Sequence, residues 1–225
     1  MLAIVGWQTE GVIADPRSAL RAAQLYLVAG ILCDEHLDAA LQGGVQVVQL
    51  RIKSAEDEEI VSTGRRYASL CERHGVPLIL NDRPDLVEAV GADGVHLGQD
   101  DTAPQRARAL LGPQRLVGLS THSEAQIDAA TGLAVDYIGV GPVYATPTKP
   151  GRPPVGLELV AYARKHAGLP FFAIGGIDPG TLPAVVAAGA RRVAVVRAIT
   201  QTADAEGAAR MLRAGLELEA PVGAA

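Results

Sequence analysis

Short apolar runs rich in Val, Ile and Leu alternate along the chain with longer stretches whose apolar residues recur at helical spacing. This alternation predicts βα units, because strands buried inside a parallel sheet are almost continuously apolar while the helices that cover them are amphipathic. From residue 24 onward the pattern predicts eight strands, at 24–28, 45–51, 77–81, 93–97, 115–119, 136–140, 170–174 and 192–196. It predicts helices at 34–42, 55–74, 84–90, 104–111, 123–131, 157–167, 179–188 and 203–218.

This count of βα units predicts an α/β fold of the TIM (β/α)8 barrel type, which needs roughly 200–250 residues. A doubly wound open sheet shares the local pattern, but it more often has about five or six strands and an early GxGxxG motif, which is absent after Val28. We therefore predict one catalytic barrel domain over 24–218, an N-terminal extension over 1–23 and a C-terminal tail over 219–225. The extension could be a helix that closes the barrel bottom, an arm that contacts a partner, or a loose tail.

Composition narrows the class of protein further. At 48% hydrophobic and 20% charged, the chain of 225 residues is typical of a soluble globular protein, which excludes a disordered or fibrous one. A net charge of -5 has the wrong sign for binding nucleic acid by phosphate neutralisation. Cys33 and Cys71 form no CxxC pair, and no apolar run approaches a membrane span. We expect a cytoplasmic protein with reduced thiols, no targeting signal, and neither nucleic acid nor membrane as a partner.

In a barrel of this type the chemistry lies in the loops that follow the strands. The second strand ends in Gln49-Leu50-Arg51-Ile52-Lys53, where alternation points Gln49, Arg51 and Lys53 to one side. That side is the barrel lumen, so these residues predict an anion site.

Carboxylates follow the third and fourth strands. Asp82 lies in Asn81-Asp82-Arg83, and Asp101 ends the run Gly98-Gln99-Asp100-Asp101. Neighbouring strands lie roughly 4.8 Å apart, so the two carboxylates can converge on one cation. One or two carboxylates together with substrate phosphate oxygens is the usual way of holding Mg²⁺. Alternatively, Asp82 and Asp101 cap the helices that begin near Pro84 and Pro104.

The loops after the fifth and sixth strands carry hydroxyls and one cation. Ser120-Thr121-His122-Ser123 can cap the next helix, and His122 could also act as a donor, acid or base. Residues 141–154 form a long loop with five prolines, and such loops are usually functional lids or linkers. Thr146, Thr148 and Lys149 favour a lid that handles phosphate.

Glycines follow the seventh strand, at Gly175-Gly176, and Arg197 follows the eighth. The loops after strands seven and eight form the usual phosphate site of this architecture. A metal together with several cations indicates a diphosphate, and no Ser or Cys stands in a nucleophile pattern with His and acid. The residues alone therefore predict a metal-assisted transfer between two phosphorylated small molecules.

Taken together, these motifs resemble the thiamine-phosphate synthase family. The matching stretches cover residues 24–200 in the expected order: VQLRIK at 48–53, LILNDRPDL at 78–86, GADGVHLGQDD at 91–101, VGLSTHS at 117–123, DYIGVGPVYATPTKPG at 136–151, FAIGGI at 172–177 and VAVVRAI at 193–199.

The resemblance implies that the diphosphate of a hydroxymethylpyrimidine leaves on Mg²⁺ and that the nitrogen of a thiazole phosphate captures the resulting carbocation. It implies that Asp82 and Asp101 bind Mg²⁺ and that Arg51, Lys53, Ser120 and Lys149 assist departure of the diphosphate. The implied site for the pyrimidine diphosphate is formed by Gln49, Arg51, Lys53, Asn81, Ser120 and Lys149. The implied site for the thiazole phosphate is formed by Thr146 and Thr148 with the backbone at Gly176, Val196 and Arg197. A homodimer is suggested only by analogy with the family.

Two other functions stay open. A thiazole tautomerase of the same superfamily has a similar fold and uses a histidine near the position of His122, but it does not need QLRIK, NDR and GQDD. A non-catalytic binder of thiamine precursors would keep the phosphate loops without needing both carboxylates. Metal dependence and turnover separate these alternatives from the synthase.

Overall fold

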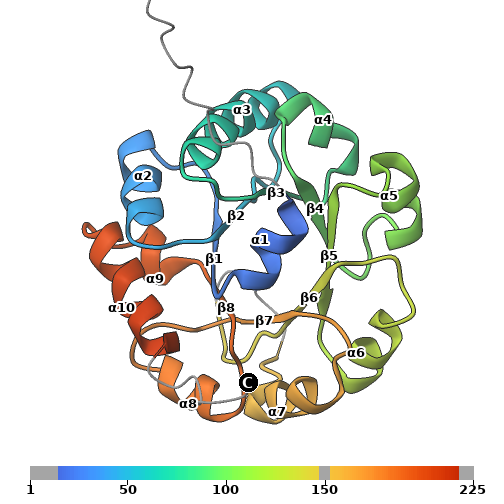
Figure 1. Cartoon of the computed structure of the whole chain (residues 1–225), viewed down its shortest axis with the longest axis vertical. Helices are drawn as coiled ribbons and strands as arrows, with labels where there is room; N and C mark the ends of the chain where they lie inside the picture. The colour runs from blue at the N-terminus through green and yellow to red at the C-terminus, as the bar shows by residue number, and fades with distance from the viewer. Residues whose placement is uncertain (1–14, 147–152, 218–225) are drawn as a thin grey trace, which may run out of the picture.

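The computed structural model describes residues 15–146 and 153–217, which form a closed barrel of parallel strands in chain order, with β8 hydrogen-bonded to β1 (Figure 1). The strands are β1 (Leu25–Ala29), β2 (Val47–Leu50), β3 (Leu78–Asn81), β4 (Gly94–Leu97), β5 (Leu116–Thr121), β6 (Tyr137–Val140), β7 (Phe171–Ile174) and β8 (Val193–Val195). Each of the eight predicted strands is present within a few residues of its expected place, which confirms the barrel.

Helices surround the strands, and all except α1 lie around the outside of the barrel, where their apolar faces are buried (Figure 1). They are α1 (Pro16–Ala22), α2 (Asp34–Gln42), α3 (Asp57–Arg73), the 3₁₀ helix η1 (Pro84–Leu86), α4 (Val87–Val90), α5 (Pro104–Leu111), α6 (Glu124–Ala130), α7 (Gly156–His166), α8 (Leu182–Ala187), α9 (Arg197–Thr200) and α10 (Ala205–Glu217). No helix within 15–146 and 153–217 is long and apolar enough to cross a membrane.

Two helical segments differ from the prediction. The single helix expected over 84–90 is a short 3₁₀ turn followed by one turn of α-helix. The chain also turns into α9 directly after β8, because the backbone carbonyl of Val196 accepts from the amides of Ile199 and Thr200 at 3.2 and 3.0 Å. Its four residues are too few for a periodic apolar pattern to show in the sequence.

Strand alternation divides the core into two layers. In β1, Leu25 and Leu27 face the helices, while Tyr26 and Val28 face the lumen. Three aromatic rings fill the lumen: Phe172 meets Tyr26 edge-on at 5.2 Å and Tyr137 edge-on at 5.8 Å between ring centroids. The three side chains of this aromatic layer are buried, so they block the barrel lumen between its two ends.

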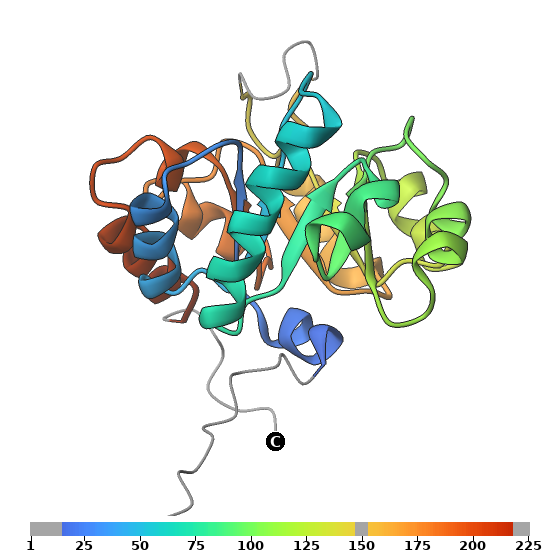
Figure 2. The same ribbon diagram turned by 90° about the horizontal axis from the view of Figure 1, so that it is seen from above.

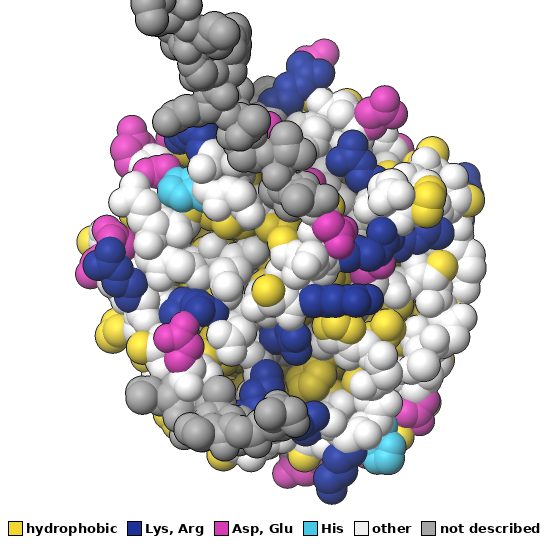
Figure 3. Space-filling model, viewed as in Figure 1, with side chains coloured by type: hydrophobic (Ala, Val, Ile, Leu, Met, Phe, Trp, Pro, Cys, Tyr) yellow, Lys and Arg dark blue, Asp and Glu magenta, His cyan; other side chains and the backbone are white. Residues whose placement is uncertain are grey.

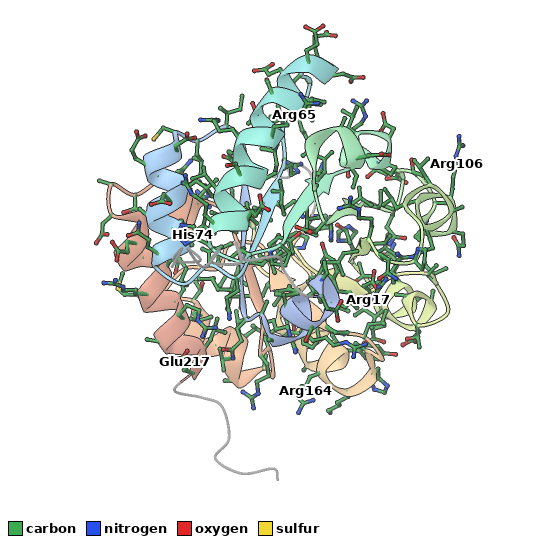
Figure 4. The ribbon with its side chains drawn as sticks, turned by 45° about the horizontal axis from the view of Figure 1, so that its top comes forward. Arg17, Arg65, His74, Arg106, Arg164 and Glu217 are labelled. Atoms are coloured by element: carbon green, nitrogen blue, oxygen red, sulfur yellow. The ribbon has the colours of Figure 1, made fainter. Side chains whose placement is uncertain are left out.

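Helix α1 covers the amino-terminal end of the barrel, opposite the ends where the strands lead into their loops (Figure 2). Asp15 caps α1 by accepting from the amides of Arg17 and Ser18, and Leu20 is buried in the same apolar cluster as the aromatic layer. Arg17 reaches from α1 to Asp136 at 2.8 Å (Figure 4). Of the three possibilities for the extension, residues 16–22 therefore form the closing helix.

Candidate active site

A pocket of about 760 Å³ opens at the carboxyl ends of the strands. Residues on or directly after all eight strands line it, so segments distant in sequence meet around one cavity. The predicted site residues that line it are Gln49, Arg51, Lys53, Asn81, Asp82, Asp101, Ser120, Thr146, Gly176, Val196 and Arg197. The predictions for Thr148 and Lys149 lie outside the described residues.

The side of the pocket formed by β2 is cationic. Gln49 is buried at 4% exposure, and Arg51 and Lys53 follow it on the same side of the chain. Within 15–146 and 153–217, neither Arg51 nor Lys53 forms a salt bridge with a carboxylate. The neighbouring Arg83 turns away from them to bind Asp57 and Asp85 at 2.6 Å each. The β2 cations therefore keep their charge available to a ligand.

Asp82 and Asp101 converge on the same wall of the pocket. Burial raises the pKa of Asp82 to about 6, and the hydrogen bond and charge of Asp101 add to the rise, while Arg51 lowers it. The backbone of Asp82 has a φ of 60°, a left-handed conformation that non-glycine residues rarely adopt and that often marks functional sites. Two carboxylates held this close favour a proton or a cation between them.

The capping alternative for these aspartates is wrong. Residues Arg83 and Ala103 occupy the N-cap positions of η1 and α5, and neither cap involves a side-chain hydrogen bond. Asp101 instead accepts from the amide of Gly98 at 2.7 Å. A Cβ at position 98 would lie 2.6 Å from that carboxylate oxygen, so a larger residue there would require the Asp101 side chain to shift.

The opposite side of the pocket is built from backbone. Gly175 and Gly176 have φ values of +108° and +67°, and a Cβ at 176 would lie 2.6 Å from the Cβ of Tyr144. Both positions therefore need glycine. The β8 loop brings Val196 and Arg197 beside them, and Arg197 forms no salt bridge with any described residue. This region offers main-chain groups and one cation.

His122 also lines the pocket, at the end of β5. Its Nδ1 is hydrogen-bonded to the carbonyl oxygen of Gly141, and its backbone amide donates to Gln126 Oε1 at 2.7 Å. A carbonyl oxygen can only accept, so Nδ1 carries the hydrogen of that bond. Ser123 caps α6 by accepting from the amide of Gln126, as predicted.

Sequence reasoning missed the polar residues of the pocket floor. Tyr26, His96 and Tyr137 all line the pocket, and Gln99 Nε2 donates to the carbonyl oxygen of Ser120 at 2.6 Å. The available signal was alternation within the strands, which puts Tyr26 in the lumen beside Val28 and His96 in the lumen between Gly94 and Gly98.

Among the described residues, no cluster of three or more His, Cys, Asp or Glu side chains could hold a metal ion. Asp82 and Asp101 supply hard oxygen ligands from two residues only. This donor set fits a Mg²⁺ ion that completes its coordination with substrate phosphate oxygens and water.

Fold and pocket together define a class: (β/α)8-barrel proteins that bring cations, paired carboxylates and glycine-built loops together in one pocket. The family described as Thiamine monophosphate synthase matches residues 25–199, which is most of the chain. The chain belongs to the thiamine monophosphate synthase family.

Relatives named thiamine-phosphate synthase are about half identical to this chain. One such protein from Thermus thermophilus is 52% identical over 180 residues, covering 80% of this chain and 86% of its own. The protein from Gloeobacter violaceus is 52% identical over 192 residues, covering 84% of this chain but only 56% of its own length. The chain therefore spans little more than half of this second relative.

A solved structure of thiamine phosphate pyrophosphorylase from Pyrococcus furiosus superimposes with a TM-score of 0.81 at 29% identity, covering 90% of this chain and 98% of its own. A 3-hexulose-6-phosphate synthase superimposes with a TM-score of 0.61 at 21% identity, which shows the fold alone.

Proposed function

We propose that this chain is a transferase of the thiamine-phosphate synthase type. It joins 4-amino-2-methyl-5-hydroxymethylpyrimidine diphosphate to 4-methyl-5-(2-phosphoethyl)thiazole and releases thiamine phosphate and pyrophosphate. The names of relatives about half identical to the chain support this assignment. The observation that carries it is the meeting of the β2 cations, the Asp82–Asp101 pair and the glycine-built loops in one pocket.

The proposed reaction needs no base. The bond between the pyrimidine methylene carbon and the diphosphate oxygen breaks, and its electron pair leaves with the diphosphate. The thiazole nitrogen then supplies the electron pair of the new carbon–nitrogen bond, so no proton has to move. This balance agrees with a pocket that offers electrostatic stabilisation rather than a nucleophile and a base.

The pocket residues divide between the two substrates in this proposal. Arg51 and Lys53 stabilise the charge that develops on the departing diphosphate, and Ser120 donates to it. Gln49, Asn81 and, outside the described residues, Lys149 complete this site. Asp82 and Asp101 would hold Mg²⁺, and its charge would neutralise diphosphate oxygens. The thiazole phosphate is assigned to Thr146, Thr148, Gly176, Val196 and Arg197. The homodimer and the cytoplasmic location stay predictions.

The test is a pyrophosphate-release assay with both substrates, first with Mg²⁺ and then with chelator, with thiamine phosphate followed by fluorescence after oxidation. We expect both products in equal amounts and only with metal. No product from folded protein would reject the synthase. Consumption of a thiazole isomer alone would then favour the tautomerase. The observation that supports this alternative is that His122 lines the pocket. Metal-independent substrate binding without turnover would favour a binder.

A further inference from the structure

A chain of side-chain hydrogen bonds crosses the floor of the pocket from β2 to β5. Gln49 Nε2 donates to the Tyr26 hydroxyl at 2.8 Å, and the hydroxyls of Tyr26 and Tyr137 lie 2.9 Å apart. The Tyr137 hydroxyl is 3.1 Å from His96 Nδ1, and His96 Nε2 is 3.0 Å from Ser120 Oγ. Strands β2, β1, β6, β4 and β5 each contribute one member.

The packing fixes this chain in place. Tyr26 and Tyr137 are 2% and 0% exposed, and Phe172 contacts both rings edge-on. A Cβ at Gly118 would lie 2.2 Å from Tyr137 Cζ and 2.6 Å from His96 Nδ1, so this glycine leaves the space in which the two rings meet. The Ser120 backbone is held separately, by Gln99. The tyrosines and His96 therefore cannot rotate to other partners without disturbing the core.

Donor and acceptor rules give the chain a direction. The amide of Gln49 can only donate through Nε2, so the Tyr26 hydroxyl accepts there and its own hydrogen is available for Tyr137. The hydrogen of Tyr137 then goes to His96 Nδ1, which leaves His96 Nε2 as the donor to Ser120 Oγ. Ser120 accepts this bond, and its own hydroxyl hydrogen is left for a group in the pocket.

We propose that Tyr26, Tyr137 and His96 are positioning residues that set Ser120 as a hydrogen-bond donor toward an anionic oxygen in the pocket. The identity of that oxygen, on the departing diphosphate, rests on the proposed function. The direction of the chain does not, because it follows from the residues themselves. Without this series of hydrogen bonds, the Ser120 hydroxyl could turn its hydrogen toward His96. It would then present only lone pairs to the anion.

The direction is tested first without any turnover. In protein labelled with ¹⁵N-histidine, at a pH where the ring is neutral, the ring-nitrogen shifts report which nitrogen of His96 carries hydrogen. We expect hydrogen on Nε2 and none on Nδ1. Hydrogen on Nδ1 in the wild-type protein would overturn the proposal, whether or not the protein is a synthase.

The second test asks whether Tyr137 acts through Ser120. We expect Tyr137→Phe to lower kcat about fivefold, the value of roughly one hydrogen bond, with less change in KM for the thiazole substrate. In a Ser120→Ala background the same change should have no further effect on kcat. Equal effects in both backgrounds would overturn the proposal.

Controls separate positioning from general damage. Tyr67→Phe removes another buried tyrosine hydroxyl, which bonds the carbonyl of Gly30 outside the pocket, and should leave kcat unchanged. If Tyr137→Phe does not fold, Tyr26→Phe tests the same chain one member earlier, with the same cycle against Ser120→Ala. If the wild-type protein has no synthase activity, binding of inorganic pyrophosphate with Mg²⁺ replaces kcat. Tyr137→Phe should then weaken binding only while Ser120 is present.

Discussion

The two ends of this barrel use aspartate in opposite ways. At the amino-terminal end, Asp136 accepts from Arg17 and Arg108 at 2.8 and 2.6 Å and from the amide of Val117 at 2.8 Å. At the carboxyl end, Asp82 has another carboxylate as its neighbour, and burial raises its pKa to about 6. At the first end the carboxylate is paired with arginines, whereas at the second end two carboxylates lie side by side in the pocket.

The cations show the same division. Figure 3 shows the face that carries α1, with Lys and Arg side chains across its centre. At this end of the barrel, Arg17 and Arg108 are bound to Asp136 and to backbone carbonyls. In the pocket at the other end, Arg51, Lys53 and Arg197 form no salt bridge with any described carboxylate. Substitutions at the two ends should therefore affect different properties.

The largest effect is expected at the open end. Asp101→Ala or Lys53→Ala should lower turnover by on the order of 10² or more with the fold intact, as the loss of one electrostatic group in an active site typically does. The measurement is steady-state pyrophosphate release, with circular dichroism to check the fold. Asp128→Ala is the matched control, because this exposed carboxylate lies outside the pocket and accepts from the Tyr162 hydroxyl on the outer surface. Near wild-type turnover in the pocket variants would contradict these roles.

At the closed end we expect a loss of stability rather than of activity. Asp136→Asn removes the charge that pairs with two arginines, and should lower the free energy of unfolding by roughly 2–3 kcal/mol. Denaturant unfolding measures this loss. Asp57→Asn, which breaks an exposed pair with Arg83, should lower the free energy of unfolding much less, because exposed ion pairs contribute little to stability. An equal loss in both variants would show that the Asp136 network stabilises the fold no more than an exposed ion pair does.

Mg²⁺ should stabilise the protein through the open end only. At ten times its dissociation constant the ion should add about 1.4 kcal/mol to the free energy of unfolding. This gain should shrink as the pH falls from 7 to 5, because protons compete for Asp82. Thermal unfolding with and without Mg²⁺ measures it. The gain should vanish in Asp82→Asn and persist in Asp136→Asn.

The last effect concerns Asp82 in the absence of metal. Its pKa rises from 3.8 to about 6 on folding, so the native state binds more protons than the unfolded state between these pH values. Stability from this group must therefore fall as the pH rises from about 4 to 6. Asp82→Asn keeps a residue type that tolerates the left-handed backbone and should remove this fall. If the free energy of unfolding varied with pH in the same way in the wild-type protein and in Asp82→Asn, the raised pKa of Asp82 would be contradicted.

The barrel could be predicted from sequence because each strand is an apolar run ended by polar residues or glycine. Arg51 and Lys53 could be predicted too, because strand alternation alone places them beside Gln49. The hydrogen-bonded floor could not. Tyr26 and Tyr137 are 111 positions apart, and His96 and Tyr137 are 41 apart, so their contacts depend on the barrel register and on the space at Gly118. The closing role of α1 also needed the structure, because Leu20 and Arg17 show their partners only once the strands are arranged.

The aromatic layer of Tyr26, Tyr137 and Phe172 makes the barrel modular. It lies between α1 and the pocket: Leu20 of α1 belongs to the same apolar cluster, and Tyr26, Tyr137 and Phe172 line the pocket on the other side. Changes beneath the layer should combine additively with changes above it, since distant sites without shared partners usually do. Thermostability could then be engineered from α1 and specificity from the loops, as two separate design problems in one small domain.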